Sequence, residues 1–145
     1  IVNAKRVEKS FWSSNLIDPV NYRQHLRKGL EQAVDTRMPE VYFHKGFKPF
    51  LEKEFPLLKK DYKHLILAHP GCSSSLLGIT RSAGGRILLA IGPEGGWVDY
   101  EVERMRESGF KGFSLGSRIL RVDTAVVALH SAVSICIGKN AQHSP

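Results

Sequence analysis

The sequence predicts an α/β fold in which a mostly parallel sheet is flanked by helices. Three short apolar runs, residues 64–68, 86–91 and 113–115, have the length and composition of buried strands. Stretches with helical spacing of apolar residues separate these runs, and strands that alternate with helices are typical of a largely parallel sheet. Glycine-containing turns follow two of the runs, and sheets of this kind bind ligands beyond the carboxyl ends of their strands.

The first predicted helix begins at Asp18-Pro19, because aspartate is a favoured N-cap and proline fits the first helical position. Pro39 limits this helix, since proline interrupts a helix interior. The apolar residues that recur at helical spacing, and so predict one buried face, are Tyr22, Leu26, Leu30 and Ala33.

The remaining predicted elements follow from local composition. Residues 99–108 form a helix that Asp99 caps and that Gly109 closes at a left-handed position. The final helix, residues 124–138, is apolar nearly all round, which predicts burial by its own sheet or by a second subunit. The less regular segments are an extended arm or strand at 3–9, a short strand at 40–44, a proline-interrupted helical stretch at 47–58, and a Ser- and Gly-rich loop at 72–85 with a short apolar piece at 76–79.

Composition bounds the class of protein. The chain has 145 residues, of which 42% are hydrophobic and 24% charged, so residues 1–145 are expected to form one domain with its own core. Its formal charge of +7 favours anionic partners, nucleic acid foremost, although basic side chains also serve simply to solvate a surface. Cys72 and Cys136 lie far apart and indicate neither a disulfide framework nor a zinc site. No apolar run reaches the ~18 residues of a membrane span and no signal peptide is visible, which predicts a cytoplasmic protein without membrane contact.

The turn at residues 92–96, Gly-Pro-Glu-Gly-Gly, is the most informative local motif. No Gly-Lys-Ser/Thr follows it and its glycines do not match GxGxxG, so it is neither a P-loop nor a dinucleotide fingerprint. Taken alone, it is equally well explained as a structural turn. The second turn, residues 115–118, leads into an apolar segment between Arg118 and Arg121, just before a helix that Asp123 or Thr124 is expected to cap.

Together the two turns resemble the signature of the bacterial 16S ribosomal RNA uracil-N3 methyltransferase family, which belongs to the SPOUT class. The family pattern, GPEGG followed by LG-x-R-(I or V)-LR-x-ETA, is met by residues 92–96 and 115–125. Upstream, Glu31-Gln32, residues 37–41 and His69-Pro70 match shorter family segments. The resemblance implies S-adenosyl-L-methionine as the cofactor and a trefoil knot in the carboxyl-terminal part of the fold, which periodicity alone does not reveal.

The resemblance also implies where the site lies. Three strand-end loops, residues 67–70, 91–96 and 115–121, are expected to meet around the methyl donor, with main-chain groups bonding its adenine. The implied cofactor-binding residues are Leu67, Ala68, His69, Ile91, Gly92, Pro93, Glu94, Gly95, Gly96, Leu115, Gly116, Arg118, Ile119, Leu120 and Ala125. Of these, Ile119 and Leu120 are expected to pack on the faces of the adenine, and no metal ligand is implied.

The implied catalytic residues are Arg121 and Glu94. N3 of uracil is a weakly acidic imide that loses its proton during attack, so a base, or a cation near the flanking oxygens, would assist. The guanidinium of Arg121 can donate hydrogen bonds to uracil oxygens or to a phosphate, and Glu94 can act as the base or orient the substrate. Structural alternatives stay open: Arg121 as an ion-pair partner of Asp123, Glu94 as a cap for turn amides, Arg118 as a phosphate contact, and His69 as a loop-shaping residue.

The sequence departs from the family pattern at three positions. Asp123 replaces the usual Glu, Val98 replaces a common helix-capping Ser, and Asp35 stands where an Arg is usual. Within residues 1–145 we find no match to the family's amino-terminal RNA-binding β-barrel or to the strand and helix that open its knotted domain, and residue 1 is Ile rather than Met. We therefore expect a sheet that lacks the family's first strand and helix.

The function that follows from the resemblance is a methyltransferase acting on ribosomal RNA of the small subunit, at N3 of a uridine. It is expected to work as a homodimer joined through the last helix. The alternatives are a catalytically inactive knotted RNA-binding module and a methyltransferase for another RNA base. Basic residues expected on the RNA-facing surface are Lys5, Arg6, Lys9, Arg23, Arg27 and Lys28.

Overall fold

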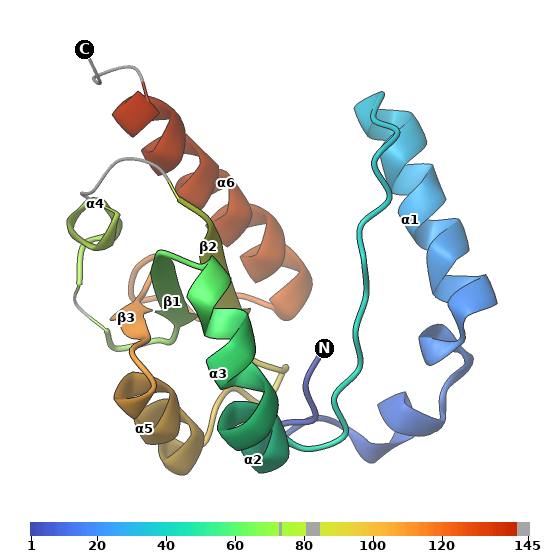
Figure 1. Cartoon of the computed structure of the whole chain (residues 1–145), viewed down its shortest axis with the longest axis horizontal. Helices are drawn as coiled ribbons and strands as arrows, with labels where there is room; N and C mark the ends of the chain where they lie inside the picture. The colour runs from blue at the N-terminus through green and yellow to red at the C-terminus, as the bar shows by residue number, and fades with distance from the viewer. Residues whose placement is uncertain (73, 81–84, 142–145) are drawn as a thin grey trace.

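Three parallel strands form the sheet of the computed structural model, which describes residues 1–72, 74–80 and 85–141. β1 (His64–Ala68) lies in the centre, between β2 (Ile87–Ile91) and β3 (Lys111–Phe113). Ala68 pairs with Ile91 on one side and with Phe113 on the other, so the three carboxyl ends meet at one edge of the sheet (Figure 1). The predicted α/β class with parallel strands is confirmed.

The third strand lies two residues earlier than predicted. Among the described residues it pairs with β1 alone, and β1 ends at Ala68, opposite Phe113. Ser114 and Leu115 therefore belong to the loop beyond the strand rather than to the strand itself. The Ser114 hydroxyl donates to the carbonyl of Gly116 at 2.8 Å and so helps to shape that loop.

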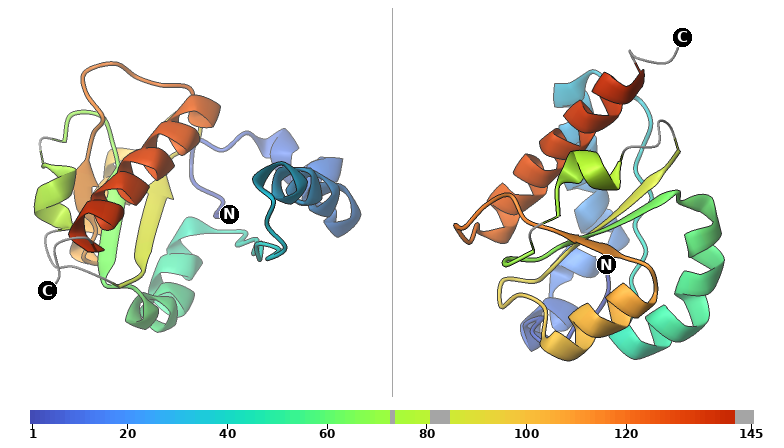
Figure 2. Two further views of the ribbon diagram at one scale, coloured as in Figure 1. Left: turned by 90° about the horizontal axis from the view of Figure 1, so that it is seen from above. Right: turned by 90° about the vertical axis from the view of Figure 1, so that its left-hand side faces the viewer.

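Helices cover both faces of the sheet (Figures 1 and 2). One layer holds α2, η3, α3 and α5, and the other holds α4 and α6. The helical stretch predicted at 47–58 is confirmed, whereas the apolar piece at 76–79 of the predicted loop 72–85 forms a short helix; residues 73 and 81–84 of that loop lie outside the described residues. The bounds of these helices are α2 (Phe47–Pro49), η3 (Phe50–Glu54), α3 (Phe55–Leu58), α4 (Leu76–Ile79), α5 (Asp99–Glu107) and α6 (Val122–Ala141). The sheet is thus enclosed from both sides, which is the usual condition for a parallel sheet.

Alternate side chains of β1 enter two separate hydrophobic clusters. Leu65 and Leu67 pack with Phe55 and Met105 on the side of α3 and α5, whereas Ile66 packs with residues of α4 and α6. Ile66 and Leu67 are both 0% exposed. Because both faces of the strand are covered, the sequence of β1 is a continuous apolar run rather than an alternating one.

The start of α5 differs from the prediction. Val98, not Asp99, occupies the N-cap position, and a valine side chain cannot accept a hydrogen bond. Instead, the Glu101 carboxylate reaches back and accepts from the backbone N–H of Val98 at 3.1 Å. The predicted closure by Gly109 is confirmed, because this residue adopts φ +103°.

α6 begins two residues earlier than predicted and is not buried on every side. The Arg121 carbonyl already accepts from the N–H of Ala125, so Asp123 lies inside the first turn, where a carboxylate favours the helix dipole. Leu129 and Val133 are buried against the sheet, but other apolar side chains of the helix face solvent. The exposed apolar residues of α6 are Val126, Val127, Ile135 and Ile137.

α1 (Pro19–Ala33) begins as predicted, with the Asp18 carboxylate accepting from the N–H of Val20 at 2.8 Å. It ends at Ala33, because Val34 adopts a left-handed conformation well before Pro39. The helix stands apart from the sheet in Figure 1 and in the left-hand view of Figure 2, and none of its residues is buried. The predicted buried face is therefore wrong for this chain: helical spacing selects the apolar face but does not supply an element that covers it.

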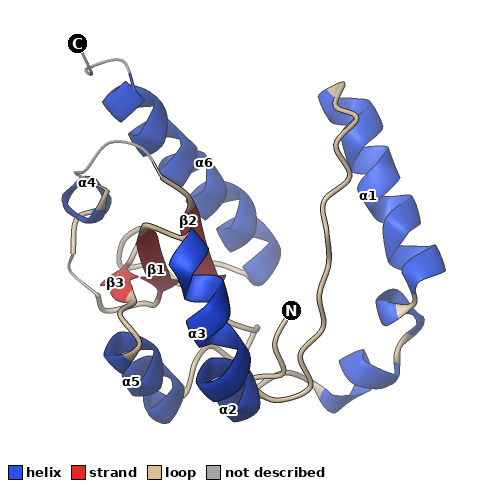
Figure 3. Cartoon of the chain, viewed as in Figure 1, coloured by secondary structure: helices blue, strands red, loops and turns tan. Residues whose placement is uncertain are grey.

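The amino-terminal arm contains little regular structure before α1 (Figure 3). Two short 3-10 helices, η1 (Lys9–Ser13) and η2 (Asn15–Ile17), follow an arm that turns at residues 4–7. No strand forms at residues 3–9, and the predicted arm is only partly extended. The strand predicted at residues 40–44 does not form: an isolated bridge between Val2 and His44 stands in its place. A single bridge pairs only a few backbone groups, so the predicted segment has no ladder of hydrogen bonds that would make it a strand.

Candidate functional site: a pocket at the strand ends

A cavity of about 320 Å³ opens at the carboxyl edge of the sheet, where the three strands end. Its volume lies at the lower end of the range for small-molecule sites. It is lined by Arg6, Ala68, His69, Pro70, Ile91, Gly92, Pro93, Glu94, Gly95, Gly96, Trp97, Phe113, Ser114, Leu115, Arg118, Ile119, Leu120, Val122, Ala125 and Leu129. All three loops predicted to converge contribute to this one cavity.

Backbone hydrogen bonds hold these loops in place. The N–H of His69, just past β1, donates to the carbonyl of Phe113 at the end of β3 over 3.0 Å. Within the second loop, the N–H of Gly96 donates to the carbonyl of Pro93 at 2.7 Å and closes the turn. The positions of these loops around the cavity therefore follow from the strand pairing and from their own turns.

A positively charged residue of the amino-terminal arm lies over the second loop. Arg6 lines the cavity and its Nη1 donates to the carbonyl of Gly95 at 2.7 Å. A Cβ at position 95 would lie 2.9 Å from the Cβ of Arg6, so this close approach requires glycine. The neighbouring backbone N–H of Lys5 donates to buried Glu101 at 2.7 Å, which anchors the arm to the start of α5.

Two ring nitrogens in the cavity wall lack hydrogen-bond partners. Among the described residues, Nδ1 of His69 and Nε1 of Trp97 are buried without one. An unsatisfied buried polar atom costs free energy, and such atoms in a native structure call for an explanation. Both atoms are already shielded by the protein itself, so they lie behind the surface of the cavity rather than on it.

The third loop presents apolar side chains to the cavity. Ile119 is 82% exposed, and Leu115 and Leu120 are partly exposed as well. Apolar surface left in water is unfavourable by about 25 cal/mol per Å², so a flat apolar ligand that covered these side chains would be stabilised there. The cavity thus combines an apolar side with a few placed polar atoms, as small-molecule sites usually do.

Thirteen of the fifteen predicted cofactor residues line this cavity. Leu67 does not, because it is fully buried beneath it in the core, and Gly116 does not, because it lies at an exposed bend with φ +146°. Sequence reasoning missed Arg6 as a pocket residue, since 89 positions separate it from its partner Gly95. Trp97 was also missed, although its place directly after the Gly-Pro-Glu-Gly-Gly turn was a usable signal.

The two predicted catalytic residues occupy different positions. Glu94 lines the cavity and is exposed, and within the described part of the chain its carboxylate accepts no hydrogen bond, so it does not cap the turn amides. Arg121 does not line the cavity: its side chain is 88% exposed, and Nε lies 3.8 Å from Oδ1 of Asp123. Such an exposed ion pair contributes little to stability and leaves the guanidinium accessible. Arg118, by contrast, lines the cavity.

The fold and the cavity define an α/β ligand-binding domain whose site lies at the carboxyl edge of a parallel sheet. A family described as an RNA methyltransferase domain matches residues 1–134. The chain therefore belongs to this RNA methyltransferase family, which confirms the family that the two turns predicted.

Individual relatives agree with this assignment. The chain is 26% identical over 133 residues to a ribosomal RNA small subunit methyltransferase E of Treponema pallidum, covering 92% of the chain and 50% of the relative. It is 30% identical over 115 residues to the protein of that name from Bacillus subtilis, covering 74% of the chain and 43% of the relative. The structure of such an enzyme from Neisseria gonorrhoeae, bound to S-adenosyl methionine, matches with a TM-score of 0.74 at 26% identity, covering 92% of this chain and 53% of that one.

The chain spans about half the length of the curated relatives it matches. No helix in the described residues is both long enough and apolar enough to cross a membrane.

Proposed function

We propose that the chain is an S-adenosylmethionine-dependent methyltransferase that modifies N3 of a uridine in small-subunit ribosomal RNA. The observation that carries the proposal is the convergence of three strand-end loops on one cavity at the carboxyl ends of the parallel strands. Relatives named as small-subunit ribosomal RNA methyltransferases support the substrate, and the S-adenosyl methionine bound by the Neisseria gonorrhoeae enzyme supports the cofactor.

The residues of the cavity fit S-adenosylmethionine. Backbone groups at the ends of β1 and β2 suit the polar edge of an adenine, and Ile119 and Leu120 suit its faces. Arg6 would close the cavity from the side of the amino-terminal arm.

When bound, S-adenosylmethionine supplies a methyl group on a positively charged sulfur. In our proposal the protein's part is to position the uracil and to manage its proton. The carboxylate of Glu94 takes the proton from N3, and the guanidinium of Arg121 stabilises the negative charge that remains on the flanking uracil oxygens. The exposure of Arg121 supports this role, because a substrate arriving from solvent can reach it.

We further propose that the chain works as a homodimer through α6 and that its carboxyl-terminal part forms the trefoil knot of the family. Support for the dimer comes from the apolar side chains of Val126, Val127 and Ile135, which lie exposed on α6. An unpartnered apolar helix face is typical of a surface that a second subunit covers.

One observation favours a second candidate, a donor-binding RNA-binding module without catalysis. Arg121 lies outside the cavity lining and pairs with Asp123, where the family pattern has Glu. The two candidates differ in methyl transfer rather than in donor binding.

Calorimetric titration with S-adenosylmethionine and then with S-adenosylhomocysteine tests the pocket. We expect saturable binding of both at one molecule per subunit, and absence of binding would refute the cofactor assignment. Incubation with labelled S-adenosylmethionine and small-subunit ribosomal RNA, followed by mass analysis of the nucleosides, then tests the reaction. 3-Methyluridine supports the first proposal, binding without transfer supports the second, and a different methylated base overturns the assignment to N3.

A further inference from the structure

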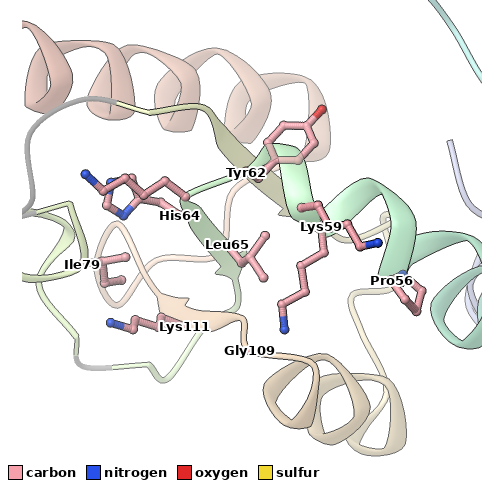
Figure 4. A pocket seen from close by; sticks show the side chains of 10 residues that line it. Pro56, Lys59, Tyr62, His64, Leu65, Ile79, Gly109 and Lys111 are labelled. Carbon is pink, nitrogen blue, oxygen red and sulfur yellow. The ribbon is translucent and has the colours of Figure 1, made fainter.

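A second cavity, of about 400 Å³, lies at the opposite edge of the sheet, where β1 and β3 begin (Figure 4). It lies between the end of α3, η4 (Lys59–Asp61) and the first residues of the two strands. Its lining residues are Pro56, Lys59, Lys60, Tyr62, Lys63, His64, Leu65, Ile79, Gly109 and Lys111. The proposed donor pocket is about 13 Å away, since four residues of β1 at roughly 3.3 Å each separate the two edges.

Positive charge dominates this cavity. Four lysines line it, and no acidic residue does. Asp61, which follows Lys60 in the chain, is not among the lining residues. Two acidic side chains of the neighbouring helices pair elsewhere: Glu52 and Glu107 both contact Arg104. Within the described residues, Lys60 and Lys111 form no ion pair. Like charges that share one cavity repel each other, so an anion bound there lowers the free energy.

The local structure fixes part of this arrangement. Nζ of Lys59 donates to the carbonyl of Ser108 at 2.8 Å, which leaves further N–H donors of the same ammonium available. Arg86 adds a guanidinium next to the cavity, with its Cζ 4.8 Å from the centre of the Tyr62 ring. In Figure 4 the ammonium groups of Lys59 and Lys111 point in different directions rather than toward one point.

We propose that this cavity, defined by Lys59, Lys60, Lys63 and Lys111, binds the phosphodiester backbone of an RNA strand. Separated cations suit successive phosphates along a chain better than a single phosphate, which would require convergent donors. The inference goes beyond the proposed reaction but rests on RNA as its substrate. It assigns a backbone contact that lies on the far side of the sheet from the methyl donor and positions RNA without reading its sequence.

The test compares two double variants of the full chain that remove the same charge. Lys60→Gln with Lys111→Gln alters the cavity, and Lys45→Gln with Lys48→Gln alters exposed lysines elsewhere. Binding of a labelled single-stranded oligouridylate is measured by fluorescence anisotropy across a range of NaCl concentrations. For the cavity variant we expect about a tenfold loss of affinity near 0.1 M salt, and a salt slope shallower by about 1.4, roughly 0.7 for each lost phosphate contact. The control should lose less than half as much on a logarithmic scale.

Each outcome decides between specific alternatives. Equal losses in both variants would mean that only overall charge matters, and they would overturn the site. If inorganic tripolyphosphate binds the wild-type chain and loses affinity in the cavity variant while oligouridylate does not, the cavity is a small-anion site and the RNA assignment fails. Calorimetry with S-adenosylmethionine should give the same affinity in all three proteins. A wild-type chain that binds the donor but no RNA would overturn this inference and leave the donor pocket intact.

Discussion

Glu101 shows how one buried carboxylate organises residues that carry out other tasks. It is 2% exposed, and its two oxygens accept from the backbone N–H groups of Lys5 and Val98. The first bond ties down the arm that brings Arg6 to the cavity, and the second completes the start of α5 directly after the Gly-Pro-Glu-Gly-Gly turn. Hydrogen bonds to a carboxylate stabilise a fold more than hydrogen bonds between neutral groups do, so the two bonds to Glu101 are strong ones.

Replacing Glu101 with Ala should therefore destabilise the fold and weaken donor binding together. Two part-buried N–H groups would lose their acceptor, which costs about 2–3 kcal/mol of unfolding free energy. Urea denaturation measures this loss, and Glu103→Ala on the exposed side of the same helix is the matched control. If Glu101→Ala and Glu103→Ala unfold at the same urea concentration, Glu101 does not anchor the arm.

Gly116 is a second residue with consequences beyond its own contacts. A Cβ there would meet nothing within 4 Å, but φ is +146°, where residues with side chains are strained. Gly116→Val should cost about 1–3 kcal/mol in that conformation, so the third loop would rearrange to relieve it. We expect donor affinity to fall at least tenfold by calorimetry. Ser117→Val, one position on at an ordinary backbone angle, is the control, and equal affinities for the two variants would contradict the role of the bend.

Substitution of Arg121 tests whether donor binding and methyl transfer depend on different residues. Because its side chain is outside the cavity lining and largely in solvent, Arg121→Ala should leave donor affinity nearly unchanged. Loss of a group that stabilises developing charge lowers turnover by about 100-fold or more. Single-turnover transfer to ribosomal RNA measures the second quantity, and Arg121→Lys should restore part of it. Equal losses of affinity and transfer would mean that Arg121 belongs to the donor site.

At the scale of elements, the sequence predicted what depends on local chemistry. β1 and β2 were found from apolar runs, and α5 from its glycine-terminated helical pattern, because those signals lie within each segment. Tertiary pairing decided the rest. β3 stops at Phe113 because β1 supplies no further partner, and the apolar face of α1 stays only half-buried although Tyr22 contacts Phe43. Neither fact is contained in local spacing.

α6 gives a prediction at this scale, since its two sides differ in burial. Leu129 is buried against the sheet and also lines the cavity, so Leu129→Ala should remove about 3 kcal/mol of unfolding free energy through the cavity it leaves. Ser134→Ala on the exposed side should change it by no more than about 0.5 kcal/mol. Chemical denaturation compares the two. Similar denaturation midpoints for the two variants would mean that Leu129 does not lie on the buried side of α6.

At the scale of the whole molecule, the site could be predicted only as far as chain order allows. Three loops at the ends of parallel strands must converge, and they do so around one cavity. Arg6 enters that cavity from the other end of the chain, held by Glu101 and Gly95, and no local pattern links these residues. The exposed position of Arg121 was also beyond sequence reasoning, because it depends on where the third loop leaves the sheet.

The proposed self-association through α6 also depends on the whole molecule. Val133 is one of the apolar residues of α6, but it is 7% exposed and packs in the core. A charge at this position should therefore unfold the domain rather than separate subunits. Val127 is 68% exposed on the same helix. Val127→Glu should therefore keep the wild-type circular dichroism spectrum yet convert a dimer into a monomer by light scattering, because a carboxylate would be buried unpaired at the interface. A Val127→Glu protein that stays dimeric would remove this face of α6 from the interface, and a monomeric wild type would refute the dimer itself.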